Sequence, residues 1–132
     1  MTGPRPPFFD RLQGWWDSLA SPGRPPHRDA VAPIEIMPML PHLVMVDLTG
    51  LAPRVLWAGT AVKEMLGGDP AGLAIDQTPF ADDHVADAFG ELVGAGRPLD
   101  AVLGGRRMLL CPLAGDDGAI TTVLAGVAPT AV

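Results

Sequence analysis

In RPLDAVLGGRRMLLCPLAGDDGAITTVLAGVA, residues 97–128, three apolar segments are separated by two turn sequences. We expect strands at 97–103, 106–113 and 119–128, because Gly104-Gly105 and the Gly-Asp-Asp-Gly sequence at 115–118 are typical of tight connections. Neither of the last two strands alternates cleanly between apolar and polar residues, so both faces of their sheet should be at least partly covered. This stretch therefore predicts an antiparallel meander with other elements packed on each side.

A hairpin and two helices are expected before the meander. LVMVDL (43–48) and RVLWAG (54–59) are apolar strand sequences on either side of the turn TGLAP (49–53). From Thr60 the apolar period becomes helical, which predicts a short helix with Thr60 as N-cap and Gly67 as its end. Residues 81–96 predict a second helix, with an apolar face formed by Val85, Ala88, Phe89, Leu92 and Val93.

An amphipathic helix with an aromatic face is predicted at residues 8–19, FFDRLQGWWDSL. Its large apolar side chains recur at helical spacing and must be buried against another surface. They cover the outer face of the chain's own sheet, or they form a dimer interface. The residues of this face are Phe8, Phe9, Leu12, Trp15, Trp16 and Leu19. The proline-rich connector that follows, residues 21–33, should contain no regular structure.

These elements predict an α+β domain with one antiparallel sheet of about five strands, and 132 residues suffice for one core. The net charge is −6, with five basic against twelve acidic residues after residue 30. This charge disfavours nucleic acids and anionic membranes as partners. One cysteine excludes an internal disulfide and a cysteine-built zinc site. The start, MTGPRPPFFD, lacks the apolar core of a signal peptide, so we expect a cytoplasmic protein.

Three stretches resemble a family of stand-alone PAS proteins common in alphaproteobacteria: RPPHRDAVAPIEIMPMLPHLVMVDL (24–48), RVLWAGTAV (54–62) and LLCPLAGDDGAITTVLAGVAP (109–129). The shared features are the tryptophan helix, the LPH entry into the first strand and the AGT that ends the second. The resemblance implies sheet order 2-1-5-4-3, with short helices on one face. It divides the chain into a helical cap and connector at 1–33 and a PAS core at 34–132. The chain departs from the family at Val55 and Leu56, where Tyr and Arg are usual.

By the same resemblance, the helices of residues 60–93 enclose a small pocket against the sheet. The positions expected to face it form a mostly apolar set, with two methionines that can adapt to a guest. They are Val55, Trp57, Met65, Phe80, Phe89, Met108 and Leu110. Two interpretations remain open for this set: a filled core and a pocket for a small apolar ligand.

The sequence gives little support for catalysis, a metal or a cofactor. It contains no nucleophile, phosphate-loop or metal-ligand motif, so we expect no enzyme activity. His84 lies where haem-binding PAS domains carry their iron ligand, but Asp82 and Asp83 beside it indicate an exposed flank, so haem is not favoured. Cys111 in its Cys-Pro dipeptide is interpreted as a buried strand thiol. Six acids without a base between Asp69 and Glu91 predict a solvated face or a docking surface for a basic partner.

The function that the resemblance implies is a single-domain PAS sensory or regulatory module in bacterial signal transduction. It would act through small-molecule sensing and protein–protein interaction, as a homodimer and with a signalling partner such as a histidine kinase. A ligand-free dimeric adaptor for signalling proteins is the alternative, and a haem or other cofactor sensor is the third.

Overall fold

A computed structural model describes residues 5–31 and 33–131. The helical segments and strands are, in chain order, α1 (Pro7–Leu19), η1 (Arg28–Ala30), α2 (Pro33–Ile36), η2 (Met37–His42), β1 (Leu43–Asp47), β2 (Arg54–Ala58), α3 (Thr60–Leu66), η3 (Ile75–Gln77), α4 (Val85–Ala95), β3 (Leu99–Leu103), β4 (Arg106–Ala114) and β5 (Ile120–Ala131). The strands form one antiparallel sheet in the order β2-β1-β5-β4-β3, which confirms the expected fold and order.

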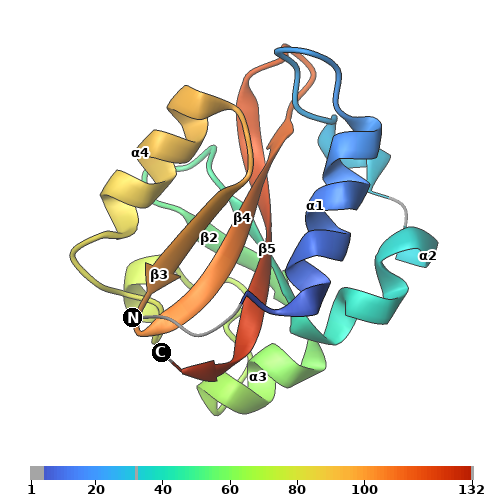
Figure 1. Cartoon of the computed structure of the whole chain (residues 1–132). Helices are drawn as coiled ribbons and strands as arrows, with labels where there is room; N and C mark the ends of the chain where they lie inside the picture. Colours follow the sequence, from blue (N-terminus) through green and yellow to red (C-terminus); the bar gives the residue numbers. More distant parts are fainter. Residues whose placement is uncertain (1–4, 32, 132) are drawn as a thin grey trace.

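The sheet separates two apolar clusters. Figure 1 shows α1 along one face of the sheet, α4 on the other side and α3 at one end. The cluster between the sheet and α3, η3 and α4 is called the inner core. The cluster between the sheet and α1, α2 and η2 is called the outer core. Alternate residues of β4 enter each: Leu110 belongs to the inner core and Leu109 to the outer core. This double burial explains why β4 and β5 do not alternate in polarity.

The long aromatic helix approaches the sheet closely because one strand residue has no side chain. A Cβ on Gly126 of β5 would lie 2.9 Å from a ring atom of Phe8 and 3.1 Å from a methyl of Leu12. The glycine thus leaves space for α1 to lie across β5. The expectation that the aromatic helix covers the outer face agrees with this packing.

Three details of the predicted helices need correction. Gly59, not Thr60, is the N-cap of α3, and Thr60 is its first helical residue. The second helix begins at Val85 rather than at residue 81, because Asp82 accepts the backbone N–H of His84 and holds a turn before it. Val93 was expected on the apolar face of this helix but is 48% exposed.

Candidate functional site

An apolar groove of about 900 Å³ lies on the outer side of the sheet, beside the ends of β1 and β2. Its floor includes Met45 of β1 and Trp57 of β2, which are directly paired across the two strands. Its opposite wall comes from α2 and η2 through Ile36, Met37 and Leu40. The volume lies within the range of about 300–1,000 Å³ that is typical of small-molecule sites.

A bulge in β2 places Trp57 in this groove. Val46 pairs with Val55 and Met45 pairs with Trp57, so Leu56 is an extra residue in the ladder. An extra residue reverses the alternation of side chains beyond it. Val55 therefore enters the inner core, whereas Trp57 packs against the outer core.

The groove wall meets the end of β2 at a close backbone contact. A Cβ on Gly59 would lie 2.5 Å from the carbonyl oxygen of Pro41 and would also collide with the carbonyl of Leu40. Pro38 and Pro41 break up the segment into a 3-10 helix, since neither has an N–H for an α-helical ladder. The glycine and the two prolines together bring η2 over the end of the hairpin.

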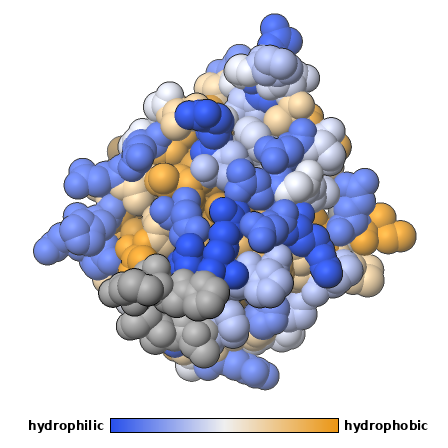
Figure 2. Space-filling model, viewed as in Figure 1, coloured by the Kyte–Doolittle hydropathy of each residue, from blue (hydrophilic) through white to orange (hydrophobic). Residues whose placement is uncertain are grey.

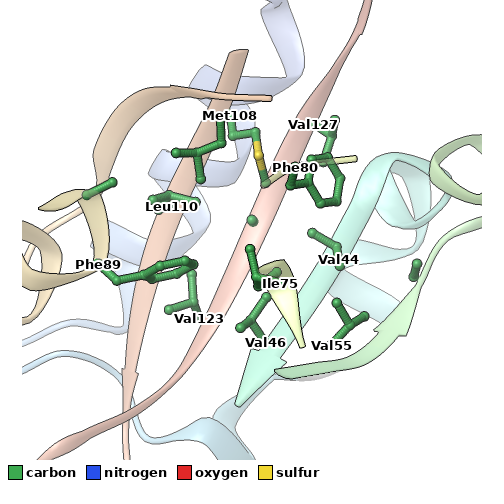
Figure 3. Close-up of a cluster of buried hydrophobic side chains, with 14 of the residues drawn as sticks. Val44, Val46, Val55, Ile75, Phe80, Phe89, Met108, Leu110, Val123 and Val127 are labelled. Atoms are coloured by element: carbon green, nitrogen blue, oxygen red, sulfur yellow. The ribbon is translucent and has the colours of Figure 1, made fainter. Parts of the chain in front are cut away.

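The residues predicted to face a ligand lie on two sides of the sheet. Six of the seven, all except Trp57, belong to the inner core or pack against it. Figure 3 shows Phe80, Phe89, Met108 and Leu110 among the side chains that are packed together in this core. Met65 of α3 is the one of these six that is only partly buried. The structure therefore packs the inner set as a core and brings Trp57 to the outer groove.

The predicted interface residues of α1 lie mostly against the chain's own sheet. Phe9, Leu12, Trp15 and Trp16 are buried in the outer core, Phe8 is half-buried, and Leu19 is 37% exposed. Figure 2 shows mainly hydrophilic side chains on the face of the molecule that carries α1, β3 and β4. A hydrophobic protrusion at the right edge lies where Figure 1 places α2, whose Ile34 is 78% exposed.

Two indole hydrogen bonds fasten α1. The Nε1–H of Trp16 donates to the backbone carbonyl of Pro112 in β4 at 2.7 Å, and that of Trp15 donates to Glu35 Oε2 in α2 at 2.9 Å. The Phe8 ring also lies against His42 at the end of η2, with 5.4 Å between ring centroids. The helix is thus connected both to the sheet and to the segment that forms the groove wall.

A cluster that the sequence analysis missed joins the connector to the β4–β5 turn. His27, Asp29 and Asp116 are the group of potential metal ligands found among residues 5–31 and 33–131. The His27 Nδ1 accepts the backbone N–H of Asp29 at 3.0 Å, so the neutral ring carries its proton on Nε2, which lies 2.8 Å from Asp116 Oδ1. Both nitrogens are therefore engaged, and we interpret the cluster as a structural link. His27 and Asp116 are 89 positions apart in the sequence, so no local spacing could have revealed the cluster.

The other residues that the sequence analysis singled out are Cys111, His84 and the acids from Asp69 onward. Cys111 is buried in the outer core, and this burial raises the pKa of its thiol, which keeps it protonated and unreactive. His84 is exposed, as expected. Asp82 accepts backbone N–H groups from Gly104 and His84, both at 2.8 Å, and the bond from Gly104 contributes most to a lowered pKa. Lys63 pairs with Asp69 at 3.7 Å at the start of the acidic run.

The longest helix among the residues described, α1, has 13 residues, and none there is long and apolar enough to cross a membrane.

Comparison with known proteins supports the fold and does not assign a family. No family model matches the chain, and no curated protein matches it. A solved structure described as "Flavin Analogue Sheds Light on Light-Oxygen-Voltage Domain Mechanism" has a TM-score of 0.54 at 14% identity, covering 70% of this chain and 79% of the other. With the strand order, this likeness shows a PAS-type fold, of which light-oxygen-voltage domains are one form.

Two further solved structures belong to longer chains, and this chain matches only about a third of each. An RNA-binding light-oxygen-voltage receptor has a TM-score of 0.46 at 14% identity, with 78% of this chain and 35% of the receptor covered. An uncharacterized protein from Mycobacterium tuberculosis has a TM-score of 0.44 at 19% identity, with 67% and 28% covered.

The residues present do not fit a flavin that reacts with a cysteine inside the fold. The one cysteine, Cys111, lies in the outer core, across the sheet from α3 and α4. The space between the sheet and those helices holds packed side chains, including Phe80 and Phe89.

Proposed function

We propose that this protein is a non-enzymatic sensory or regulatory module of the PAS type that acts in the cytoplasm in bacterial signal transduction. In this proposal a small apolar molecule binds in the outer groove. A signalling protein such as a histidine kinase then binds the ligand-bound and the ligand-free states with different affinity. The observation that carries the proposal is the groove itself, because an apolar hollow of about 900 Å³ lined by an exposed methionine and a half-buried tryptophan is the form of a ligand site.

The connections of the groove wall give the bound molecule a route to α1. Met37 and Leu40 of the wall belong to η2, which is continuous with Glu35 in α2 and ends at His42. Glu35 accepts the Trp15 indole N–H, and His42 lies against Phe8. A ligand that favours one position of this wall therefore also favours one position of α1, provided that its affinity differs between the two positions.

The methionines allow a direct test, because they divide between the two sides of the sheet. Met37 and Met45 line the groove, whereas Met65 and Met108 pack in or against the inner core. We would record methyl NMR spectra of the full chain with ¹³C-labelled methionine during titration with 2-naphthalenemethanol and, separately, with its saturated analogue decahydro-2-naphthalenemethanol. Both are neutral apolar probes. Native mass spectrometry of the same samples would give the stoichiometry and the oligomeric state.

We expect saturable shifts of the Met37 and Met45 methyls for at least one of the two probes, with one added molecule per chain. Shifts confined to Met65 and Met108 would move the site to the inner core and contradict the proposal. Unchanged methionine spectra with bare chains in the mass spectrum would favour the ligand-free adaptor. The packed inner core already makes the adaptor the second candidate. Competition for Met37 and Met45 by a second copy of the chain, seen as a dimer mass, would identify the groove as a self-association surface.

A further inference from the structure

We propose that the outer groove selects a planar aromatic molecule without a negative charge, an inference that rests on the groove being the ligand site proposed above. Two independent features of the lining lead to it. One is the state of its charged residues, and the other is the chemistry of its largest side chains.

The one basic side chain among the groove-lining residues already has a partner of opposite charge, because Arg28 Nη2 lies 4.0 Å from Asp116 Oδ2. Asp29 Oδ2 lies 3.6 Å from His27 Nδ1, but this nitrogen accepts the backbone N–H of Asp29 and brings the carboxylate no positive charge. These contacts belong to the cluster that links the connector to the β4–β5 turn. A carboxylate on a ligand would therefore enter an apolar space that offers it no free countercharge and that also holds the carboxylate of Asp29. Removing an anion from water without a partner is costly, so the lining disfavours negatively charged ligands.

The uncharged part of the lining favours an aromatic ring. Trp57 and Met45 are cross-strand neighbours on the floor, and Met37 on the wall is 59% exposed and free to adapt. An indole face attracts the edge or the offset face of another ring, and thioether sulfurs make favourable contacts with aromatic groups. A saturated molecule of the same volume would bury a similar apolar area without these contacts. The floor thus distinguishes aromatic from aliphatic guests.

Four probes with one carbon skeleton separate charge from aromaticity. They are 2-naphthalenemethanol, 2-naphthoate, 2-naphthylmethylammonium and decahydro-2-naphthalenemethanol, titrated into the full chain at pH 7 while the Met37 and Met45 methyls are followed. We expect the neutral aromatic alcohol to bind about tenfold or more tightly than 2-naphthoate. The ammonium probe has the same ring and the opposite charge, and it should not show this loss of affinity. We also expect the neutral aromatic alcohol to bind about threefold or more tightly than the saturated alcohol.

The variant Trp57→Leu keeps the groove apolar and removes the ring. It should bring the affinities of the aromatic and saturated alcohols close together while both still bind. Met108→Leu, in the inner core, is the matched control and should leave their ratio unchanged. If Trp57→Leu does not fold, Met45→Leu offers the same comparison through the sulfur contact.

Equal affinity for 2-naphthoate and the neutral alcohol, or for the saturated and aromatic alcohols, would overturn this selectivity and leave the groove as the ligand site. Failure of both neutral alcohols to move the groove methionines would overturn the proposed function as well. The two proposals therefore fail in different ways.

Discussion

Gly59 lies at a close backbone contact between the groove wall and the end of β2. Any side chain there would meet backbone atoms of Leu40 and Pro41, which cannot turn away as a flexible side chain can. We predict that Gly59→Ala lowers the free energy of unfolding by about 2 kcal/mol, in the range of other overpacked sites. Urea unfolding followed by circular dichroism measures the change.

Gly14 supplies the matched control for this substitution. It lies inside α1, and a Cβ there would meet nothing within 4 Å. Gly14→Ala should therefore raise stability by about 0.5–1 kcal/mol, because alanine loses less backbone freedom in a helix. If Gly59→Ala proved as harmless as Gly14→Ala, the close contact between η2 and the hairpin would be wrong.

At the scale of elements, α1 is fixed to the sheet through Trp16. Its indole N–H donates to the carbonyl of Pro112, and the bond is buried. Trp16→Phe would leave that carbonyl without its donor, which costs about 1–2 kcal/mol of stability beyond the loss of ring area. Trp15→Phe loses a similar area, but its former partner Glu35 is exposed and can bind water instead. We expect the urea midpoint of Trp16→Phe to be the lower of the two, and the reverse order would contradict this anchoring.

Asp82 connects two other elements, the start of α4 and the β3–β4 turn, by accepting N–H groups from His84 and Gly104. These bonds, chiefly that from Gly104, lower the pKa of its carboxyl below the ordinary value of 3.8. A carboxylate with a lowered folded-state pKa contributes stability that is fully present above the unfolded pKa and is lost as the pH falls through the folded pKa. We therefore predict that Asp82→Asn is less stable than wild type at pH 7.

The pH dependence of this difference is the sharper measurement. The stability gap between wild type and Asp82→Asn should stay constant down to about pH 5 and shrink as the pH falls below 3.8. Asp83→Asn, a charge change at the exposed neighbouring position, controls for net charge. A gap that widened on acidification would show that the carboxylate is not the favoured acceptor at this junction.

The elements with a strong local period could be predicted from the sequence, because spacing alone decides which side of a helix or strand is apolar. The α1 prediction of 8–19 differs from the observed Pro7–Leu19 by one residue. Trp57 is a residue for which this reasoning gives the wrong side of the sheet. Strict alternation places it on the same side as Val55, whereas the bulge at Leu56 moves it across the sheet. Bulges carry no reliable local signal at an ordinary apolar residue, so the groove could not be found without tertiary structure.

At the scale of the whole molecule, the charge opposes close approach of acidic partners. The net charge of −6 is concentrated after residue 30, and the segments that carry the acidic run pack on the side of the sheet opposite α1 through Ile75, Phe80 and Phe89. Glu91, at the end of the run, lines a hollow together with Gln13 and Trp16 of α1. A partner that binds α1 can therefore dock without contacting most of the acidic residues.

The boundary expected between residues 33 and 34 separates α1 from the sheet that it covers, so a fragment cut there tests how much the core depends on α1. Phe9, Leu12, Trp15 and Trp16 of α1 cover Leu109 and other outer-core residues. Each of these four buried side chains contributes about 1.5–3 kcal/mol, and a domain of this size has about 5–15 kcal/mol in total. We therefore predict that a fragment of residues 34–132 has no cooperative urea transition and binds a hydrophobic dye on its uncovered sheet.

A synthetic peptide of residues 5–31 gives this experiment its control, because the contacts between α1 and the sheet do not require a continuous chain. Adding the peptide in excess should restore a cooperative transition and displace the dye, since a segment that binds only the folded fragment stabilises it by mass action. The same peptide with Trp16→Phe should restore it less well, as it lacks the donor to Pro112. Cooperative unfolding of the fragment alone, without dye binding, would instead show that the PAS core folds independently and that α1 is an accessory helix free to move in signalling.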